Sequence, residues 1–83
     1  EVQARVALAT KAEVDAAVER AAQAQVKWGA TNPQRRARVM MEFVRLINRD
    51  MDALAEALSS EHGKTIPDAR GDIQRGLEVV EFC

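Results

Sequence analysis

The chain has little cysteine, little charge imbalance and no long apolar run. Its 83 residues contain one cysteine, which excludes an internal disulfide and a cysteine-based zinc site and is compatible with a reducing cytoplasm. Lys and Arg number 12 and Asp and Glu number 13, so no net field attracts nucleic acid or an anionic membrane. No apolar segment approaches the roughly 20 residues that span a bilayer, and no signal peptide is visible. We therefore expect a cytoplasmic protein with no nucleic-acid and no membrane partner.

The size of the chain limits it to one small domain. A chain of this length buries only about 60–65% of its unfolded surface, so a free-standing core would be marginal. The sequence begins inside an alternating apolar pattern and stops within the apolar stretch GLEVVEFC. We interpret it as a fragment of a longer protein. The alternative is a trimmed small helical domain.

The first residues alternate between apolar and other side chains. Val2, Ala4, Val6 and Leu8 occupy every second position. This period predicts a strand at about 2–8. Because an isolated strand leaves its backbone groups unpaired, we expect its partner strand to come from outside this sequence.

Helical spacing of apolar residues, together with capping residues, predicts a chain of helices after this strand. The helices are expected at about 11–28, 33–49, 51–62 and 66–82. The expected N-caps are Thr10, Asn32, Asp50 and Thr65, and the expected stops are Gly29 and Gly63. The predicted fold class is therefore mainly α, with one N-terminal strand plus about four helices.

The helix expected at 33–49 carries two neighbouring apolar stripes. One stripe contains Ala37, Met40, Val44 and Ile47, and the other contains Val39, Phe43 and Leu46. A face this wide predicts burial against more than one neighbour. On the last helix, Gly71 and Gly76 each cost up to about 1 kcal/mol relative to alanine. We expect another backbone or a ligand to lie close to them.

The stretch EHGKTIPDARGDIQRG, from Glu61 to Gly76, contains Gly-Lys-Thr and raises the question of a phosphate-binding loop. A Walker A loop needs G-x-x-x-x-G-K-[ST] after a strand, but its first glycine would fall on Leu58, and a helix is expected there. The dinucleotide pattern G-x-G-x-x-G is absent. We interpret Gly63 as a helix stop and Thr65 as a helix start.

Three further candidates have simpler structural explanations. The basic run from Arg35 to Arg38 lies in the first turns of a helix, with Glu42 four residues beyond Arg38, which favours a solvated or salt-bridging face over phosphate binding. His62 has no second ligand at metal-binding spacing. Cys83 follows an apolar helical stretch, so we expect a core cysteine and not a nucleophile.

Arg75 is the candidate binding residue of the last helix. It lies four residues after Gly71, whose missing side chain leaves an open shelf beside the arginine stem. A guanidinium held over such a shelf can bind a carboxylate through two hydrogen bonds. The alternative is a surface arginine that pairs with Asp72 or Glu78, and the residues alone favour this alternative.

The ordered features resemble a known family. Two segments, KAEVDAAVERAAQAQVKW and PQRRARVMMEFVRLINRDMDALAEALSSEHGKTIPDARGDIQRGLEVVEF, are similar to the N-terminal part of the aldehyde dehydrogenase superfamily. Within them, SSEHGKTIPDARGDIQRGLEVVEF resembles the acylating methylmalonate/malonate-semialdehyde dehydrogenases. The matching pattern consists of Trp28, Arg36, Leu54, Glu61, Gly63, Lys64 and Ala69. Asp72 departs from it, because a glutamate is commoner there, and keeps the charge.

The resemblance implies a larger parent enzyme with an α/β aldehyde dehydrogenase fold, of which residues 1–83 form the N-terminal helical part of the NAD-binding domain. Such enzymes attack the aldehyde with a cysteine thiolate, transfer hydride to NAD and, in this subgroup, pass the acyl group to coenzyme A. The nucleophile and the cofactor sites would lie downstream, and Cys83 does not match the nucleophile's motif. The expected partners are the remainder of the chain and, in a homo-oligomer, further copies of the parent.

By the same resemblance, the segment alone is expected to be inactive, to supply no catalytic residue and to bind no metal or cofactor. Arg75 matches the arginine of G-[DE]-x-x-R-G, which implies that it contributes to binding the substrate carboxylate. Gly71 and Gly76 would then be close-packing positions beside the substrate channel. The alternative function is a small helical protein-interaction module without enzymatic activity.

Overall fold

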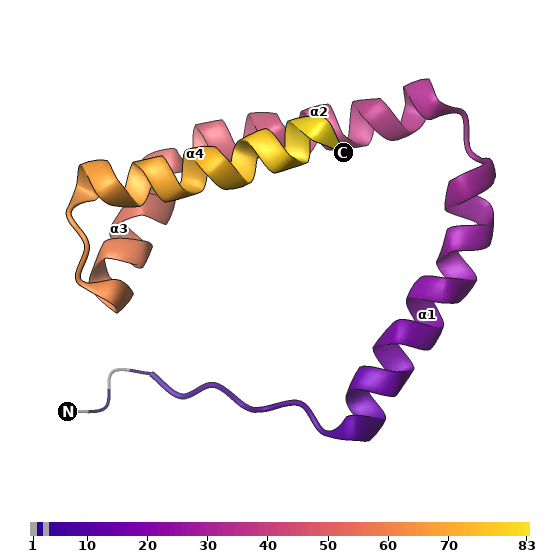
Figure 1. Ribbon diagram of the computed structural model, residues 1–83, viewed down its shortest axis with the longest axis horizontal. Helices are drawn as coiled ribbons and strands as arrows, with labels where there is room; N and C mark the ends of the chain where they lie inside the picture. Colours follow the sequence, from indigo (N-terminus) through magenta and orange to yellow (C-terminus); the bar gives the residue numbers. More distant parts are fainter. Residues whose placement is uncertain (1, 3) are drawn as a thin grey trace. The chain divides into compact units, whose positions relative to one another are not determined.

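The computed structural model describes residue 2 and residues 4–83 and divides into two units, Glu1–Thr31 and Asn32–Cys83. The described residues form the helices α1 (Lys11–Ala30), α2 (Pro33–Arg49), α3 (Met51–His62) and α4 (Ile66–Phe82), which Figure 1 labels along the chain. None of these helices is both long enough and apolar enough to cross a bilayer. The bounds of α2, α3 and α4 coincide with the ranges expected from the sequence.

The strand expected at about 2–8 is not formed by the described residues. Val2 and residues 4–10 adopt neither helix nor strand, and residue 3 lies outside the described residues. A strand is stabilised by ladder hydrogen bonds to a neighbour, and the described chain supplies no second strand. The prediction is therefore corrected to irregular backbone ahead of α1.

Local hydrogen bonds set both ends of α1. The amide of Glu13 donates to Thr10 Oγ1 at 3.2 Å and the amide of Thr10 donates to Glu13 Oε2 at 3.1 Å, which is the expected capping box. The expected stop at Gly29 is wrong, because this glycine lies within the helix. The helix instead ends at Ala30 with Thr31 as its C-cap, and the Thr31 hydroxyl donates to the Lys27 carbonyl at 2.8 Å.

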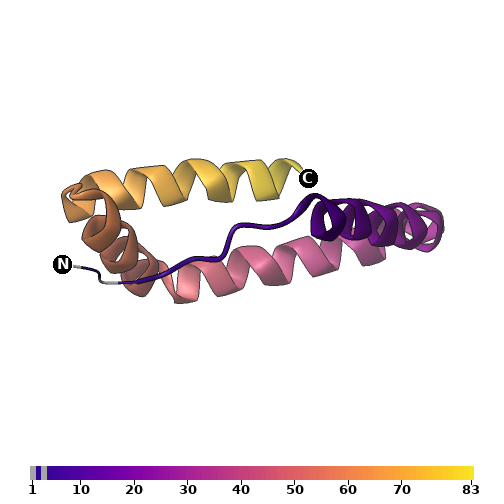
Figure 2. The same ribbon diagram turned by 90° about the horizontal axis from the view of Figure 1, so that it is seen from below.

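The second unit is a helical assembly in which α4 packs against both α3 and α2. Figures 1 and 2 show α4 running alongside α2, with α3 connecting them at one end. Ala55 of α3 and Ala69 of α4 are fully buried, and Leu77 of α4 is 3% exposed. Small buried side chains allow two helices to approach closely, so the α3–α4 contact depends on alanine at these positions.

Capping in the second unit follows the expectation at α2 and departs from it at α3. Asn32 Oδ1 accepts from the amide of Gln34 at 2.8 Å, with Pro33 at the first helical position. Asp50 precedes α3 but makes no side-chain cap hydrogen bond. Its carboxylate instead accepts from Arg49 Nε at 3.0 Å and Nη2 at 2.8 Å, so both oxygens are occupied elsewhere.

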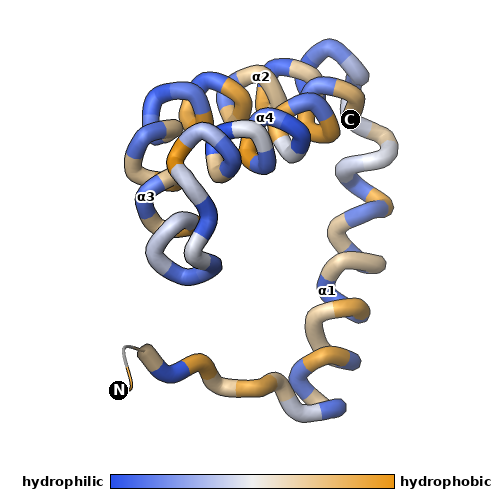
Figure 3. The backbone as a smooth tube through the Cα atoms, turned by 60° about the vertical axis from the view of Figure 1, so that its left-hand side comes forward, coloured by the Kyte–Doolittle hydropathy of each residue, from blue (hydrophilic) through white to orange (hydrophobic). Residues whose placement is uncertain are grey.

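The two apolar stripes of α2 differ in burial. Met40, Val44 and Ile47 of the first stripe are half-buried, whereas Val39 and Phe43 of the second are exposed. Figure 3 shows the alternation of hydrophobic and hydrophilic residues along α2 and α4. Ala37 of the first stripe is exposed and Leu46 of the second is half-buried, so the second unit covers each stripe only in part.

The turn at Gly63 generates a stability prediction. Gly63 has φ +80° and donates its amide to the Ser59 carbonyl at 2.8 Å, so Gly63→Ala should destabilise the second unit by about 1–2 kcal/mol through left-handed backbone strain. Gly76→Ala is the matched control, because its new Cβ meets no described atom within 4 Å in a helical conformation. It should stabilise α4 by up to about 1 kcal/mol. Thermal unfolding followed by circular dichroism measures both, and equal midpoints for the two variants would contradict the assignment.

Candidate functional site

A shallow depression lies where the α3–α4 connection meets the first turns of α4. It has a volume of about 330 Å³ and is lined by Lys64, Pro67, Asp68, Gly71, Asp72 and Arg75. Its lining therefore combines two cations with two carboxylates around a glycine. This arrangement brings Lys64 of the connection next to residues of α4, and it contains the arginine singled out from the sequence.

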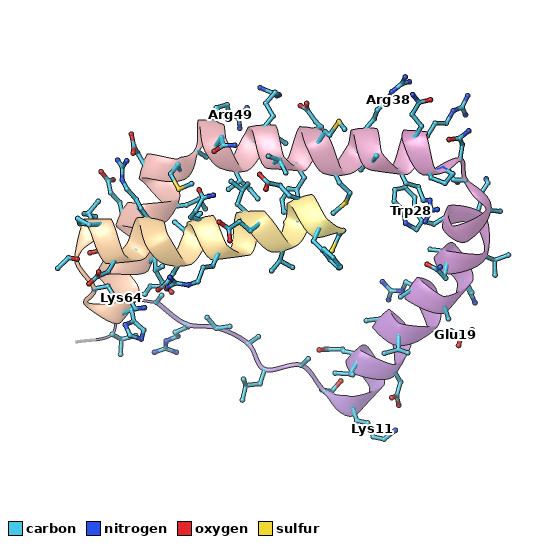
Figure 4. All side chains as sticks on the ribbon, turned by 45° about the horizontal axis from the view of Figure 1, so that its top comes forward. Lys11, Glu19, Trp28, Arg38, Arg49 and Lys64 are labelled. Carbon is cyan, nitrogen blue, oxygen red and sulfur yellow. The ribbon has the colours of Figure 1, made fainter. Side chains whose placement is uncertain are left out.

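Lys64 is placed by the hydrogen bonds of the α3–α4 connection. Gly63 turns the chain in the left-handed conformation, and Ser59 Oγ donates to the Lys64 carbonyl at 2.5 Å. One residue later, Thr65 Oγ1 accepts from the Asp68 amide at 3.3 Å and starts α4. Figure 4 shows Lys64 at this junction between α3 and α4. Hydrogen bonds of the neighbouring residues therefore fix the backbone on both sides of Lys64, independently of the contacts of its side chain.

Asp72 connects the two cations of the depression. Its Oδ2 accepts a hydrogen bond from Lys64 Nζ, and its Oδ1 accepts one from Arg75 Nη2. The side chains of Asp72 and Lys64 are 27% and 31% exposed, whereas that of Arg75 is 71% exposed. The Lys64–Asp72 pair is therefore the inner part of the cluster, and Arg75 is its solvent-facing end.

The two cations change the acidity of Asp72. The hydrogen bond from Lys64 lowers the pKa of the Asp72 carboxyl below its ordinary value. Partial desolvation opposes this shift by disfavouring the charged form, and the hydrogen bond from Arg75 adds to the lowering. The net effect keeps Asp72 ionised to lower pH than a solvated aspartate.

Gly71 leaves the space beside Arg75 that its sequence position suggested. A Cβ built on Gly71 would lie 3.8 Å from Arg75 Nη1, which is ordinary van der Waals contact. Apart from the adjacent backbone of α4 itself, no other described atom comes within 4 Å of that position, nor any of the equivalent position on Gly76. The close-packing role expected for these two glycines therefore has no neighbour among the described residues other than Arg75.

The depression has the chemistry of an anion-binding site. Arg75 uses Nη2 for Asp72, and its remaining guanidinium N–H groups have no hydrogen-bond partner among the described residues. They can donate hydrogen bonds to a carboxylate, for which the planar guanidinium is well suited. The pairing of Arg75 with Asp72, which the residues alone favoured, therefore coexists with a free donor edge. Asp68, in the same lining, opposes the binding of a second anionic group close to it.

The other candidates from the sequence lie elsewhere. Glu42 accepts from Arg45 Nε at 2.9 Å and Nη2 at 2.6 Å, so its carboxylate pairs one turn ahead and not with Arg38. His62 ends α3 and is exposed, and the described residues contain no group of three or more His, Cys, Asp and Glu side chains that could hold a metal ion. Cys83 is exposed, which corrects the expectation of a core cysteine, because no described residue covers it beyond the end of α4.

Sequence reasoning did not identify Lys64 as a partner of Asp72. The two residues are eight apart and lie on different elements, so neither helical nor strand periodicity relates them. The available signal was the pairing of a stop at Gly63 with a start at Thr65, which confines Lys64 to a short turn. The direction of its side chain depended on how α4 packs on α3.

The ion pair predicts how the acidity of Asp72 responds to mutation. Lys64→Met should raise the pKa of the Asp72 carboxyl, because it removes the hydrogen bond that lowers it most, and Arg75→Leu should raise it less. Because the folded pKa lies below the unfolded one, the stabilisation is present above the unfolded pKa and is lost as pH falls through the folded pKa. Carbon NMR titration of the carboxyl groups measures this shift. Lys11→Met, which removes the partner of Asp15 in the first unit, is the control, and an unchanged Asp72 midpoint in Lys64→Met would refute the assignment.

Comparison with known proteins places the chain in a family. The sequence relatives include a Caenorhabditis elegans mitochondrial methylmalonate-semialdehyde/malonate-semialdehyde dehydrogenase [acylating], 51% identical over 100% of this chain and 16% of the relative. A malonate-semialdehyde dehydrogenase 1 from Shouchella clausii is 45% identical over 100% of this chain and 17% of the relative. The chain thus spans about one sixth of the length of these relatives.

A solved structure agrees with these relatives. It is described as a methylmalonate-semialdehyde dehydrogenase from Sinorhizobium meliloti 1021 complexed with NAD, and it matches 99% of this chain and 17% of its own length, with a TM-score of 0.90 and 68% identity. The family model named Aldehyde dehydrogenase family matches residues 1–83, which is the whole sequence. The chain therefore belongs to the aldehyde dehydrogenase family.

Proposed function

We propose that the chain is the N-terminal helical part of the NAD-binding domain of an NAD-dependent, coenzyme A-acylating methylmalonate- or malonate-semialdehyde dehydrogenase. Support comes from the family match over all 83 residues and from relatives whose names carry this activity. The similar solved structure was determined with NAD. Coenzyme A is proposed as the acyl acceptor, and the word acylating in the names of relatives such as those of C. elegans and Arabidopsis thaliana supports an acyl transfer.

Arg75 is proposed to bind the carboxylate of the semialdehyde. The observation that carries this role is the free edge of its guanidinium beside Gly71, at the solvent-facing end of the ion-pair cluster. Methylmalonate and malonate semialdehydes differ from simple short aldehydes by a carboxylate, which such an edge binds in two-pronged geometry. Arg75 would then select the charged substrate, while the chemistry at the aldehyde takes place on other residues.

The described residues do not fit either cofactor. They contain no strand–turn–helix unit, and the sequence lacks the G-x-G-x-x-G turn that holds a dinucleotide pyrophosphate. Cys83 is an exposed thiol beyond the end of α4, and no described base or helix N-terminus activates it. We therefore assign NAD, coenzyme A and the thioester-forming cysteine to the remainder of the parent protein.

The interaction-module alternative is not favoured. Its main support was the presence of apolar faces, and several remain open, including an apolar groove of about 410 Å³ formed by Ala37, Met40, Met41 and Val44 of α2 with residues 80–83. A match of the whole chain to an enzyme family explains such faces as surfaces for the longer chain of its relatives. A homo-oligomeric parent stays a prediction of the resemblance, and a cytoplasmic location stays a prediction from the composition; some relatives are named as mitochondrial.

Arg75→Leu in the full-length dehydrogenase tests the binding role. The KM for malonate semialdehyde should rise roughly 10- to 100-fold, because hydrogen bonds to a charged group contribute about 1.5–3 kcal/mol. The KM for propanal, which lacks the carboxylate, should stay unchanged. Steady-state kinetics with both substrates measure the difference.

Arg70→Leu is the matched control for this experiment. Arg70 is an arginine of the same helix that pairs with Asp52 of α3, outside the depression. Its replacement should leave the ratio of the two KM values unchanged. A parallel loss on both substrates in Arg75→Leu would argue for a structural role of Arg75 and against carboxylate binding.

A further inference from the structure

We propose that Asp72, held in place by Lys64, is a positioning residue that orients the guanidinium of Arg75 for the substrate carboxylate. This role rests on the proposed function, in which Arg75 binds that carboxylate. Asp72 itself would not touch the substrate. It would fix one edge of the guanidinium so that the other edge faces an incoming anion.

The Asp72 carboxylate is divided between two partners. Oδ1 accepts from Arg75 Nη2 and Oδ2 accepts from Lys64 Nζ, so each oxygen serves one cation. Asp72 and Lys64 are each about one-third exposed or less, whereas Arg75 is mostly exposed. The less exposed, inner pair therefore holds the outer, more exposed side chain.

Lys64 lies in the α3–α4 connection, whereas Asp72 lies in α4. A hydrogen bond to a residue of the same helix would leave the carboxylate dependent on α4 alone. Lys64 lies instead in the connection, where the hydroxyl of Ser59 on α3 holds its carbonyl and Gly63 fixes the preceding turn. The orientation of the Asp72 carboxylate therefore depends on how α4 packs on α3.

Ordering an arginine side chain costs conformational entropy. A free arginine side chain samples many rotamers, and a ligand that fixes it loses affinity by the entropy removed. A guanidinium already held at Nη2, with Nη1 over the open side of Gly71, has less freedom to lose. Its remaining N–H groups then meet the carboxylate in one preferred geometry.

The charge of Asp72 acts in the opposite direction to its orienting effect. Its carboxylate partly neutralises Arg75 and Lys64, and Asp68 adds a second negative charge to the lining. If charge alone mattered, removing Asp72 would strengthen anion binding. Attraction between exposed charges is weakened by water and by salt, so we expect the loss of orientation to dominate. The two effects predict opposite changes in KM.

The test uses the full-length dehydrogenase and four variants of this cluster. Asp72→Asn should raise the KM for malonate semialdehyde about tenfold, the scale expected for one charge-assisted hydrogen bond, with kcat and the KM for propanal unchanged. Asp72→Glu should restore the KM, because it returns a carboxylate that can reach both cations. Lys64→Met, which leaves α4 untouched, should raise the KM in the same direction but less. Arg75→Leu reports on the anchor itself.

A double variant and a matched control complete the design. Once Arg75 is leucine, adding Asp72→Asn should raise the KM no further, because the group to be oriented is gone. Asp52→Asn removes the carboxylate of the other ion pair between α3 and α4, that with Arg70, and should leave both KM values unchanged. If Asp72→Asn does not fold, Lys64→Met and the Asp72→Glu variant still probe the link.

The outcomes distinguish a failure of the carboxylate-binding function from a failure of the positioning role. A lack of substrate-selective loss in Arg75→Leu overturns the carboxylate-binding function. A selective loss in Arg75→Leu, together with an unchanged or lowered KM in Asp72→Asn and an unchanged KM in Lys64→Met, overturns the positioning role and leaves the anchor intact. Equal losses on both substrates in Asp72→Asn, or an additive effect in the double variant, would show that Asp72 acts on the fold and not through Arg75.

Discussion

The left-handed turn at Gly63 is the constraint on which the second unit depends. It ends α3 with the Gly63 amide on the Ser59 carbonyl and leaves Lys64 as the short link before Thr65 starts α4. With α3 and α4 joined in this way, the alanines at 55 and 69 can be buried and α4 can run beside α2. The same link carries the lysine that reaches Asp72. One glycine conformation therefore serves both the packing and the candidate site.

The side chains that line the site offer charges and hydrogen-bond donors. Asp72 pairs with Lys64 and with Arg75, and Arg75 keeps donor groups at its outer edge. The chain spans about one sixth of the length of its relatives. Under the proposed function, it would contribute to the choice of aldehyde, while the residues that make and break bonds lie on the rest of the parent.

Local signals predicted much of the structure because the helices are capped by their own neighbours. The Thr10 capping box, Asn32 with Pro33, and Gly63 could each be read from the sequence, and each acts as expected. The predictions of helix ends were wrong where another residue supplied the hydrogen bond or took up the capping group. Asp50 gives its carboxylate to Arg49 and not to a helix amide, and Thr31 ends α1 beyond Gly29. The strand at about 2–8 failed for a related reason, since pairing needs a neighbour that the described chain does not supply.

The sequence by itself determined where the helices lie, the family to which the chain belongs, and Arg75 beside Gly71 as the candidate anion binder. These features depend on residues within one or two turns of each other, or on the order of residues along the chain. Only the tertiary structure decided that Lys64 reaches Asp72, whose pairing with Arg75 three residues along the same helix the sequence already favoured. That link joins the connection to α4 across eight positions, and its geometry follows from the packing of α4 on α3, which no short-range pattern encodes.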